Sequence, residues 1–341
     1  TGTVTITDSN PNATQLKTIN DAVAGTVVIP NKTVTLSGSA AVLVDALAGT
    51  VTDSSSAKIT GTTTITGDNP NASQLKSIND NVDGTIVVPN KTVTLSGSAT
   101  NLAAALAGTV QDGSGDAITG TVTITGTDPT PAELKTINDS VAGTVVVPDK
   151  TATFTASASV LSAALAGTVQ DGSAAALTGA VTVNDNAGTE IAATVLSGIG
   201  GGTSGTVTVS SAIVITGNTA QVIAALDTAS TKVTASTANV VLSDTPSLTN
   251  LKKINDATAG SIKISNGAET YSGTAEILAA ALTGTVQDGS GNSLTGAMTI
   301  TGDNPTPAQL QTINNATTGN VVIPSKTVAL TGTPTVLSEA L

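Results

Sequence analysis

The chain has 341 residues and a net charge of −12, from 24 acidic residues and 12 lysines, and it contains no Cys, His, Trp or Arg. Without arginine, and with only Phe154 and Tyr271 as aromatic residues, it lacks the groups that nucleic-acid-binding proteins use, and without His and Cys it lacks the common nucleophile–base pairs of enzymes. No apolar run approaches the ~20 residues of a membrane helix, so we expect no membrane span and no catalysis, and a core of Val, Ile, Leu and Ala.

One stretch of sequence recurs along the chain with a period of about 59 residues, which indicates internal repeats. The leucine of one helical position recurs at Leu16, Leu75, Leu134, Leu251 and Leu310. The larger step between Leu134 and Leu251 indicates a degenerate copy. The sequence therefore predicts a tandem array of about six modules. Their bounds are 1–59, 60–118, 119–177, a degenerate 178–236, 237–294 and an incomplete 295–341.

The first helix of each module carries its own start and stop signals. Asn12 follows a proline and precedes Gln15 by three residues, which predicts a capping box. Equivalent pairs are Asn71 and Gln74, Thr130 and Glu133, and Thr306 and Gln309, while Ser247 and Asn250 come close to one. The helix is predicted to stop at a left-handed glycine, which is Gly25, Gly84, Gly143, Gly260 or Gly319.

The next strand and its connection suggest a hairpin. Val27 and Ile29 alternate with a residue that must face outward. In the fifth copy the connection after this strand is Asn266-Gly267, the strongest short hairpin signal. A two-residue turn there would pair Ile29 with Val34 and Val27 with Leu36, inward against inward.

A second helix follows, with Leu43 and Leu47 on one face and its end at Gly49. The module then reads strand, helix, strand, turn, strand, helix, strand. We therefore expect an α/β tandem-repeat rod of stacked β-α-β-β-α-β modules, which resemble the split βαβ unit of ferredoxin-like domains. The alternative is a curved α/β solenoid with parallel stacked strands. Strands stack ~4.8 Å apart and helices ~8–10 Å apart, so a solenoid must curve or place its helices on alternate sides.

Carboxylates near turns are the candidate metal ligands. Asp112 and Asp116 stand in QDGSGD, and Asp171 and Asp288 occupy the equivalent place in later copies. Asp and Gly suit turn conformations, which is the plain interpretation. Weak calcium binding is the functional one, although the alternating ligands and closing glutamate of an EF-hand are missing. The glycine-rich Gly198–Gly205 is predicted to be a loosened turn or bend, since no lysine follows it in phosphate-binding spacing.

Recurring asparagines and threonines allow further hypotheses. An asparagine late in the first helix, such as Asn20, is expected to bond backbone groups of the adjoining turn. Glycosylation sequons occur at Asn12, Asn31, Asn71, Asn90, Asn138 and Asn315. In strands such as 121–125 the threonines face outward, where stacked copies would form ladders able to bind ice or carry O-linked sugars. Threonine is also simply a good strand former.

The segments VTITG, PAELKTINDSVAGT and SATNLAAALAGTV together resemble the tandem regions of giant secreted bacterial surface proteins, especially of cyanobacteria. That group includes adhesins, surface-layer proteins and fibre-forming proteins. The resemblance implies an extracellular or cell-surface location and an architectural role. The glycine-rich nonapeptide calcium repeats that often accompany such regions are absent from this sequence.

We therefore expect a structural repeat segment of a surface filament, surface layer or adhesin, which provides length, stiffness and self-association. The sequence opens and closes within a repeat, and it reads as a window from a longer array that continues covalently or docks head to tail or laterally. The alternative is a binding module whose threonine ladders face ice or cell-envelope glycans.

Overall fold

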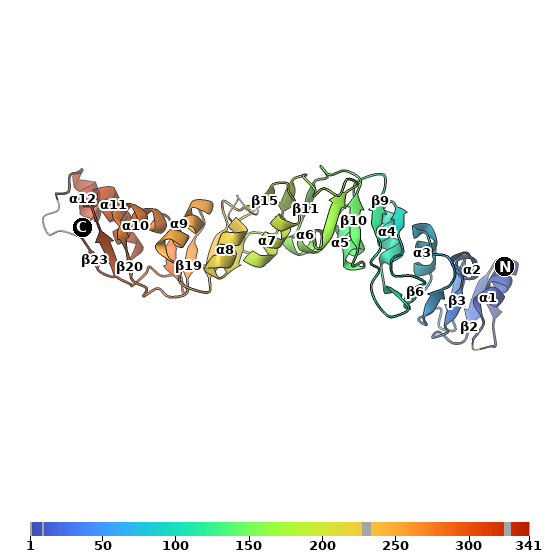
Figure 1. Cartoon of the computed structure of the whole chain (residues 1–341). Helices are drawn as coiled ribbons and strands as arrows, with labels where there is room; N and C mark the ends of the chain where they lie inside the picture. The colour runs from blue at the N-terminus through green and yellow to red at the C-terminus, as the bar shows by residue number, and fades with distance from the viewer. Residues whose placement is uncertain (1, 9, 227–232, 324–328, 341) are drawn as a thin grey trace. The chain divides into compact units, whose positions relative to one another are not determined.

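The computed structural model describes residues 2–8, 10–226, 233–323 and 329–340. Short strands and helices alternate along the chain, which is an α/β protein (Figure 1). The chain forms two compact units, Thr1–Phe154 with Ala163–Gly179, and Thr155–Ser162 with Ala180–Leu341. The division into six modules stays a prediction.

The first unit follows the predicted order of elements. It contains β1 (Val4–Thr5), α1 (Ala13–Ala22), β2 (Thr26–Ile29), β3 (Leu36–Gly38), α2 (Ala40–Ala46), β4 (Thr50–Asp53), β5 (Thr63–Ile65), α3 (Ala72–Asn79), β6 (Ile86–Val88), β7 (Leu95–Gly97), α4 (Ala99–Leu106), β8 (Val110–Asp112), β9 (Val122–Ile124), α5 (Pro131–Asp139), β10 (Thr144–Val147) and β12 (Thr168–Asp171). Both units contribute residues to β11 (Phe154–Ala156) and α6 (Ala158–Ala164).

The second unit continues with the same kinds of element. It contains β13 (Val181–Val183), β14 (Glu190–Ala192), α7 (Ala193–Gly201), β15 (Val207–Val209), β16 (Val214–Gly217), α8 (Thr219–Leu226), β17 (Val233–Thr234), β18 (Asn239–Leu242), α9 (Leu248–Ala257), β19 (Ile262–Ile264), β20 (Tyr271–Thr274), α10 (Ala275–Leu282), β21 (Val286–Asp288), β22 (Met298–Thr301), α11 (Pro307–Ala316), β23 (Val321–Val322) and α12 (Pro334–Ala340).

Every strand pair recorded in these sheets is parallel. The sheets of the first unit have the orders β1-β2-β4, β3-β5-β6-β8 and β7-β9-β10-β12. The remaining sheets have the orders β11-β13-β15-β17, β14-β16-β18-β19-β21 and β20-β22-β23. Paired residues lie a similar number of residues apart along the chain. The separation is smallest for Val240 and Ile262 and is at its largest for pairs such as Leu36 and Thr63. Each such connection contains a helix, which provides the crossover that parallel strands require.

The predicted hairpin is wrong. β2 pairs with β1 and β4, whereas β3 pairs with β5 in a different sheet. The connection between them closes locally, because the Asn31 side chain accepts hydrogen bonds from the Thr33 amide at 3.0 Å and the Thr33 hydroxyl at 2.7 Å. This turn passes the chain from one sheet to the next. The strand pairing therefore matches the parallel stacking of strands that the alternative arrangement predicts.

We call one passage through two strands and a helix a coil, and β2, β3 and α2 form the first complete one. The next coil is β4, β5 and α3, and after it the equivalent of Val27 is Ile86, one sequence repeat further on. One sequence module thus spans two coils. Each helix of a unit contacts the next, from α1 through α5 and from α7 through α12 (Figure 1).

The sheets are staggered along each unit. In the order β3-β5-β6-β8, the first two strands run into a helix and the last two leave one. A new sheet therefore begins beside the old one every two coils in the first unit. The mismatch between ~4.8 Å per strand and ~8–10 Å per helix explains this arrangement, because a sheet cannot keep step with the helix row for long.

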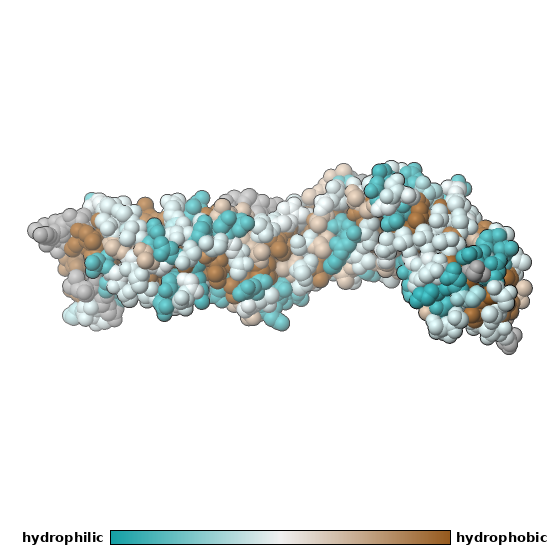
Figure 2. All heavy atoms as spheres, turned by 90° about the horizontal axis from the view of Figure 1, so that it is seen from below, coloured by the Kyte–Doolittle hydropathy of each residue, from teal (hydrophilic) through white to brown (hydrophobic). Residues whose placement is uncertain are grey.

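The core consists of the predicted small aliphatic side chains. Leu16, Leu43, Val27 and Ile29 are fully buried, and Val28 between the last two is only half-buried. The four predicted capping boxes are present, and Ser247 accepts from the Asn250 amide without the reciprocal bond. On the surface, residues of near-neutral hydropathy cover most of the face that Figure 2 shows, in keeping with the many Thr, Ser, Gly and Ala residues.

Candidate functional site

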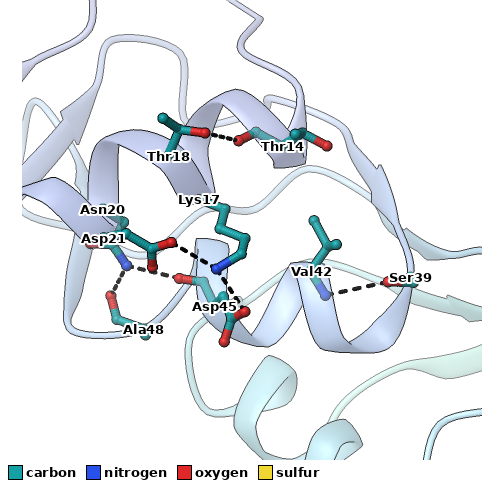
Figure 3. A network of polar contacts seen from close by, with 9 residues as sticks. All are labelled: Thr14, Lys17, Thr18, Asn20, Asp21, Ser39, Val42, Asp45 and Ala48. Atoms are coloured by element: carbon teal, nitrogen blue, oxygen red, sulfur yellow. Dashed lines mark hydrogen bonds and ion pairs between the residues drawn. The ribbon is translucent and has the colours of Figure 1, made fainter.

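The functional candidates of this chain are the contacts that join one coil to the next. In the first module the Asn20 side-chain amide donates to the carbonyl oxygens of Asp45, at 3.0 Å, and Ala48, at 2.5 Å (Figure 3). These carbonyls lie at the end of α2, where helix geometry removes the regular i+4 donors of the last turn. Each asparagine therefore caps the helix of the following coil. The equivalent donors are Asn79, Asn138 and Asn255, which bond Ala104 and Ala107, Ala163 and Ala166, and Ala280 and Thr283.

This finding refines the prediction for the recurrent asparagines. They do satisfy backbone groups, as expected. Their targets are 25 and 28 residues further along the chain, however, rather than in the adjoining turn. Asn314 holds the same position on α11, and the residue equivalent to its first target is Glu339.

A lysine adds a charged link in the first module. Lys17 Nζ lies 2.7 Å from an Asp21 oxygen within α1 and 2.9 Å from an Asp45 oxygen on α2 (Figure 3). Hydrogen bonds to Asp21 and then to Asp45 raise the pKa of the Lys17 ammonium above its ordinary value. The equivalents Lys76, Lys135 and Lys252 pair only with the aspartate four residues on, and the position of Asp45 is alanine in those copies.

The glycine predicted to end each first helix has a different role. Gly25 and its equivalents do not have positive φ, so the prediction of a left-handed cap is wrong. A Cβ atom on Gly25 would lie 1.9 Å from the Gly2 carbonyl oxygen, and one on Gly84 would lie 2.1 Å from the Gly61 oxygen. Neighbouring coils approach closely here, two residues before the first paired residues of their strands. Gly143, Gly260 and Gly319 meet the preceding coil in the same way.

The candidate calcium ligands form self-contained loops. The Asp112 carboxylate accepts from the amides of Ser114 and Asp116, both at 2.9 Å, and the Asp112 amide donates to the Asp116 carbonyl oxygen at 2.9 Å. Asp171 and Asp288 organise the same loop in their copies. A fourth loop of this kind, at Asp53, was not predicted, because it lacks the Asp-Gly signature.

Hydrogen bonding favours the ionised form of the Asp53, Asp171 and Asp288 carboxylates. The Ser55 hydroxyl, followed by the Ala57 amide, lowers the pKa of Asp53 below its ordinary value. The Ser173 hydroxyl and the Ala175 amide do the same to the pKa of Asp171. The Asn292 amide is the main cause that lowers the pKa of Asp288.

The position of these loops reveals a shared role. Each follows the last strand of a sheet, which is β4, β8, β12 or β21. The loop folds back on that strand, so that Gln111 forms an antiparallel bridge with Ala117, and Gln170 forms one with Ala176. An open strand edge invites pairing with other chains. The loops of Asp112 and Asp171 therefore cover the outer edge of their strands at Gln111 and Gln170.

No calcium site emerges from this geometry. Asp116 lies 3.5 Å from Lys91 Nζ, and the loops of Asp112, Asp171 and Asp288 belong to different coils. In the described part of the chain, no three His, Cys, Asp or Glu side chains come together as a metal-binding group. The turn interpretation accounts for the hydrogen bonds of these residues, and calcium binding stays an untested prediction.

The six sequon asparagines fall into two groups. Asn138 lies partly buried and donates both amide hydrogens, at 2.8 Å each, so a glycan on that nitrogen would break the helix cap. Asn12 and Asn71 are exposed N-caps, Asn31 and Asn90 accept bonds from their own threonine, and Asn315 is exposed. Glycosylation of these five stays a prediction.

The threonine ladders are interrupted in most sheets. The outward row through Thr123 reads Ser96, Thr123, Val146 and Gln170. One uninterrupted row occurs on the last three strands of the sheet β11-β13-β15-β17, where Thr182, Thr208 and Thr234 lie in register.

Two further features were not found from the sequence. Asp185 and Asp244 accept hydrogen bonds from the first amides of α6 and α8, at 2.6 and 2.7 Å, and so cap a helix of the preceding coil. The stretch expected to be a bend, Gly198–Gly205, instead begins inside α7, which continues to Gly201.

One buried polar group has no partner. The Thr63 side chain is fully buried, and its hydroxyl has no hydrogen-bond partner among the described residues. Thr63 is paired with Leu36 on one side and Ile86 on the other. In the next module this position is Val122.

None of the helices in the described ranges combines the length and apolar character that spanning a bilayer requires. No known protein-family model matches the chain, and no curated protein matches it in sequence.

Proposed function

We propose that the chain is a structural repeat segment of an extracellular bacterial surface filament, surface layer or giant adhesin, and that it supplies length, stiffness and self-association. In this proposal the coils of each unit form a twisting α/β solenoid. The observation that carries it is the repetition of one coil-to-coil contact, made of parallel strand pairs, a buried leucine row and an asparagine cap.

The energetics of such an array favour a mechanical role. A single coil buries too few small side chains to offset the ordering of its own residues, so each coil depends on its neighbours. Stability then accumulates along one direction. Adding a coil lengthens the array and leaves the existing contacts unchanged, which suits a spacer or a fibre.

The composition and the chemistry support the same conclusion. The described residues hold no cluster of metal-binding side chains, and the recurring lysines are used in ion pairs with aspartates on their own helix. The resemblance of the repeats to secreted surface proteins favours an extracellular location.

An insertion tests this proposal. A second copy of residues 60–118, placed directly after the first, adds two coils, or ~10–20 Å of length at ~4.8–10 Å each. For a rod, this increase raises the radius of gyration measured by small-angle X-ray scattering by ~3–6 Å. A compact globule would gain only ~1 Å, because its radius grows with about the 0.38 power of chain length. That smaller gain would contradict the proposal.

The threonine row Thr182, Thr208 and Thr234 favours a second candidate, the binding of ice or glycans. Thr208 and Thr234 are exposed, and parallel pairing sets such residues ~4.8 Å apart. Thr208→Lys should then abolish inhibition of ice recrystallisation or binding to a glycan array, while Thr123→Lys, in an interrupted row, should not. Equal activity of both variants, or no activity of the unmodified chain, would exclude this candidate.

A further inference from the structure

The pair Asn266-Gly267 is the only Asn-Gly in the sequence, and the hairpin that it predicts is not formed. It lies in the connection from β19 to β20, which belong to different sheets. The first copy has Asn31-Lys32 at this place. A Cβ atom on Gly267 would lie 2.5 Å from the Asp288 Cβ, so only glycine fits here without displacing its neighbour. Asn266 is therefore followed by a backbone nitrogen that no side chain shields.

Hydrogen bonds hold the Asn266 side chain close to the next peptide group. Its oxygen accepts from the Ala268 amide at 3.1 Å, and its nitrogen donates to a Glu269 oxygen at 3.2 Å. The bond to Ala268 folds the side chain back past Gly267, because Gly267 lies between the two bonded residues. Asn266 is exposed, and the Gly267 amide has no hydrogen-bond partner among the described residues. A free nitrogen thus lies beside a carbonyl group that a donor already polarises.

We propose that Asn266 is a site of self-modification, at which the side-chain amide is lost without an enzyme. The Gly267 nitrogen gives its proton to water and attacks Asn266 Cγ. The Ala268 amide stabilises the negative charge that develops on the side-chain oxygen. The Cγ–Nδ2 bond then breaks, and the nitrogen takes a proton from water and leaves as ammonia. Water opens the resulting cyclic imide at either carbonyl, which gives aspartate or isoaspartate.

The two products affect the fold differently. Ordinary aspartate fits, because Asp149 holds this position in the third copy and accepts from the Thr151 amide and hydroxyl, both at 2.8 Å. Isoaspartate continues the main chain through its side chain and adds one methylene just before Gly267. The Gly267 carbonyl oxygen accepts from the amides of Thr295, at 2.7 Å, and Gly296, at 3.1 Å, in the following coil. Isoaspartate therefore loosens one link between coils.

The equivalent connections of the earlier copies lack this chemistry. Lys32 and Lys91 place a side chain over the nitrogen that would attack, and Asp149 has no amide to lose. The modification is thus confined to one connection of the array. Because the loss of ammonia is slow and irreversible, that connection weakens with the age of the protein.

Mass spectrometry of the full folded chain, sampled over days at mildly alkaline pH and then digested, tests the proposal. We expect Asn266 to gain the mass difference between an amide and an acid, with both aspartate and isoaspartate present, while Asn31 and Asn90 keep their amides. The rate should rise with pH, because the attacking nitrogen must lose its proton. Native-state hydrogen exchange of the Thr295 and Gly296 amides should become faster as isoaspartate accumulates.

Two variants serve as matched controls. Asn266→Ser keeps an oxygen for the Ala268 amide but has no carbonyl carbon to attack, so its mass and its exchange rates should stay constant. Lys91→Gly creates a second Asn-Gly pair and removes only an exposed ion pair with Asp116. In this variant Asn90 should lose its amide as Asn266 does.

Three outcomes overturn the proposal. Asn266 keeps its amide in the folded chain, or its product is aspartate alone, as direct attack by water would give, or Asn90 keeps its amide in the Lys91→Gly chain. Circular dichroism shows whether each variant is folded. Lys32→Gly, which acts on Asn31, repeats the third test if Lys91→Gly does not fold.

Discussion

The orphaned hydroxyl of Thr63 offers a sharp test of the packing. Thr63→Val replaces this buried hydroxyl by a methyl group of nearly the same shape. In the unfolded state the Thr63 hydroxyl bonds to water. In the folded state the side chain is fully buried between Leu36 and Ile86, so that hydrogen bond is lost and water cannot replace it. The substitution should therefore stabilise the chain.

The magnitude follows from the cost of leaving a polar group unsatisfied. A buried hydroxyl without a partner costs ~1–3 kcal/mol, and the added methyl contributes a further hydrophobic gain of ~0.8 kcal/mol. We expect Thr63→Val to gain ~1–3 kcal/mol in the free energy of unfolding, allowing for partial relaxation around the hydroxyl. The reverse change one module later, Val122→Thr, should lose a similar amount.

Urea unfolding followed by far-ultraviolet circular dichroism measures both variants, since the chain has no Trp and a single Tyr for fluorescence. Repeat arrays can unfold in stages, so a urea midpoint alone can miss a local change in stability. Native-state hydrogen exchange of the amides around residue 63 should therefore be measured as well. If both substitutions are neutral, the position is hydrated and the register that buries it is wrong.

Further substitutions probe the contacts between coils and the aspartate loops. Asn79→Ala removes two hydrogen bonds to the next helix and should cost ~1–3 kcal/mol in urea unfolding, whereas Lys76→Ala, at an exposed ion pair, should change stability by less than ~1 kcal/mol. Gly84→Ala places a Cβ against the backbone of the preceding coil and should cost ~1–3 kcal/mol or more, while Gly113→Ala, which meets open space, should be nearly neutral; equal effects would refute the close approach. Because the folded state lowers the pKa of Asp171, its stabilising effect is complete above the unfolded value of ~3.9 and is lost as pH falls through the folded value. Asp171→Asn should therefore reduce the loss of unfolding free energy as the pH falls. If the variant loses as much stability at acid pH as the unmodified chain, the role given to the loop is contradicted.

Local features of the fold could be predicted from the sequence because each depends on residues close together in the chain. The capping boxes, the prolines at the first positions of α5 and α11 and the inward alternation of Val27 and Ile29 are of this kind. They require only helix and strand periodicity and short-range hydrogen bonds.

The choice of strand partner could not be predicted in the same way. Val27 and Leu36 face inward in a hairpin and in a parallel stack alike, so the pattern of burial is identical for both. The turn at Asn31 satisfies its own hydrogen bonds in either case. The two arrangements differ in the partners that the helix crossovers supply, because α2 carries the chain back so that β4 pairs with β2, and β3 pairs with β5 instead.

Non-local contacts also explain the misassigned glycines and the partly predicted asparagines. Gly84 suits a helix end, but the structure requires it because Gly61 of the preceding coil lies against it. The recurrence of Asn79 predicts a backbone partner, and only the stacking of coils shows which carbonyls it reaches. The aspartate loops were recognised as turns, whereas their place at sheet edges depends on the whole sheet order.

Disulfide trapping tests the central claim, parallel stacking of successive coils, most directly, and the chain offers a background without cysteine. Val28 is paired with Thr52 in the parallel sheet, whereas the hairpin register would place it opposite Thr35. Directly paired positions fall within the ~4.4–6.8 Å Cα separation that a disulfide spans. We predict rapid oxidation of the pair Val28→Cys with Thr52→Cys and little or none of Val28→Cys with Thr35→Cys. The opposite result would contradict the stacked arrangement and restore the hairpin.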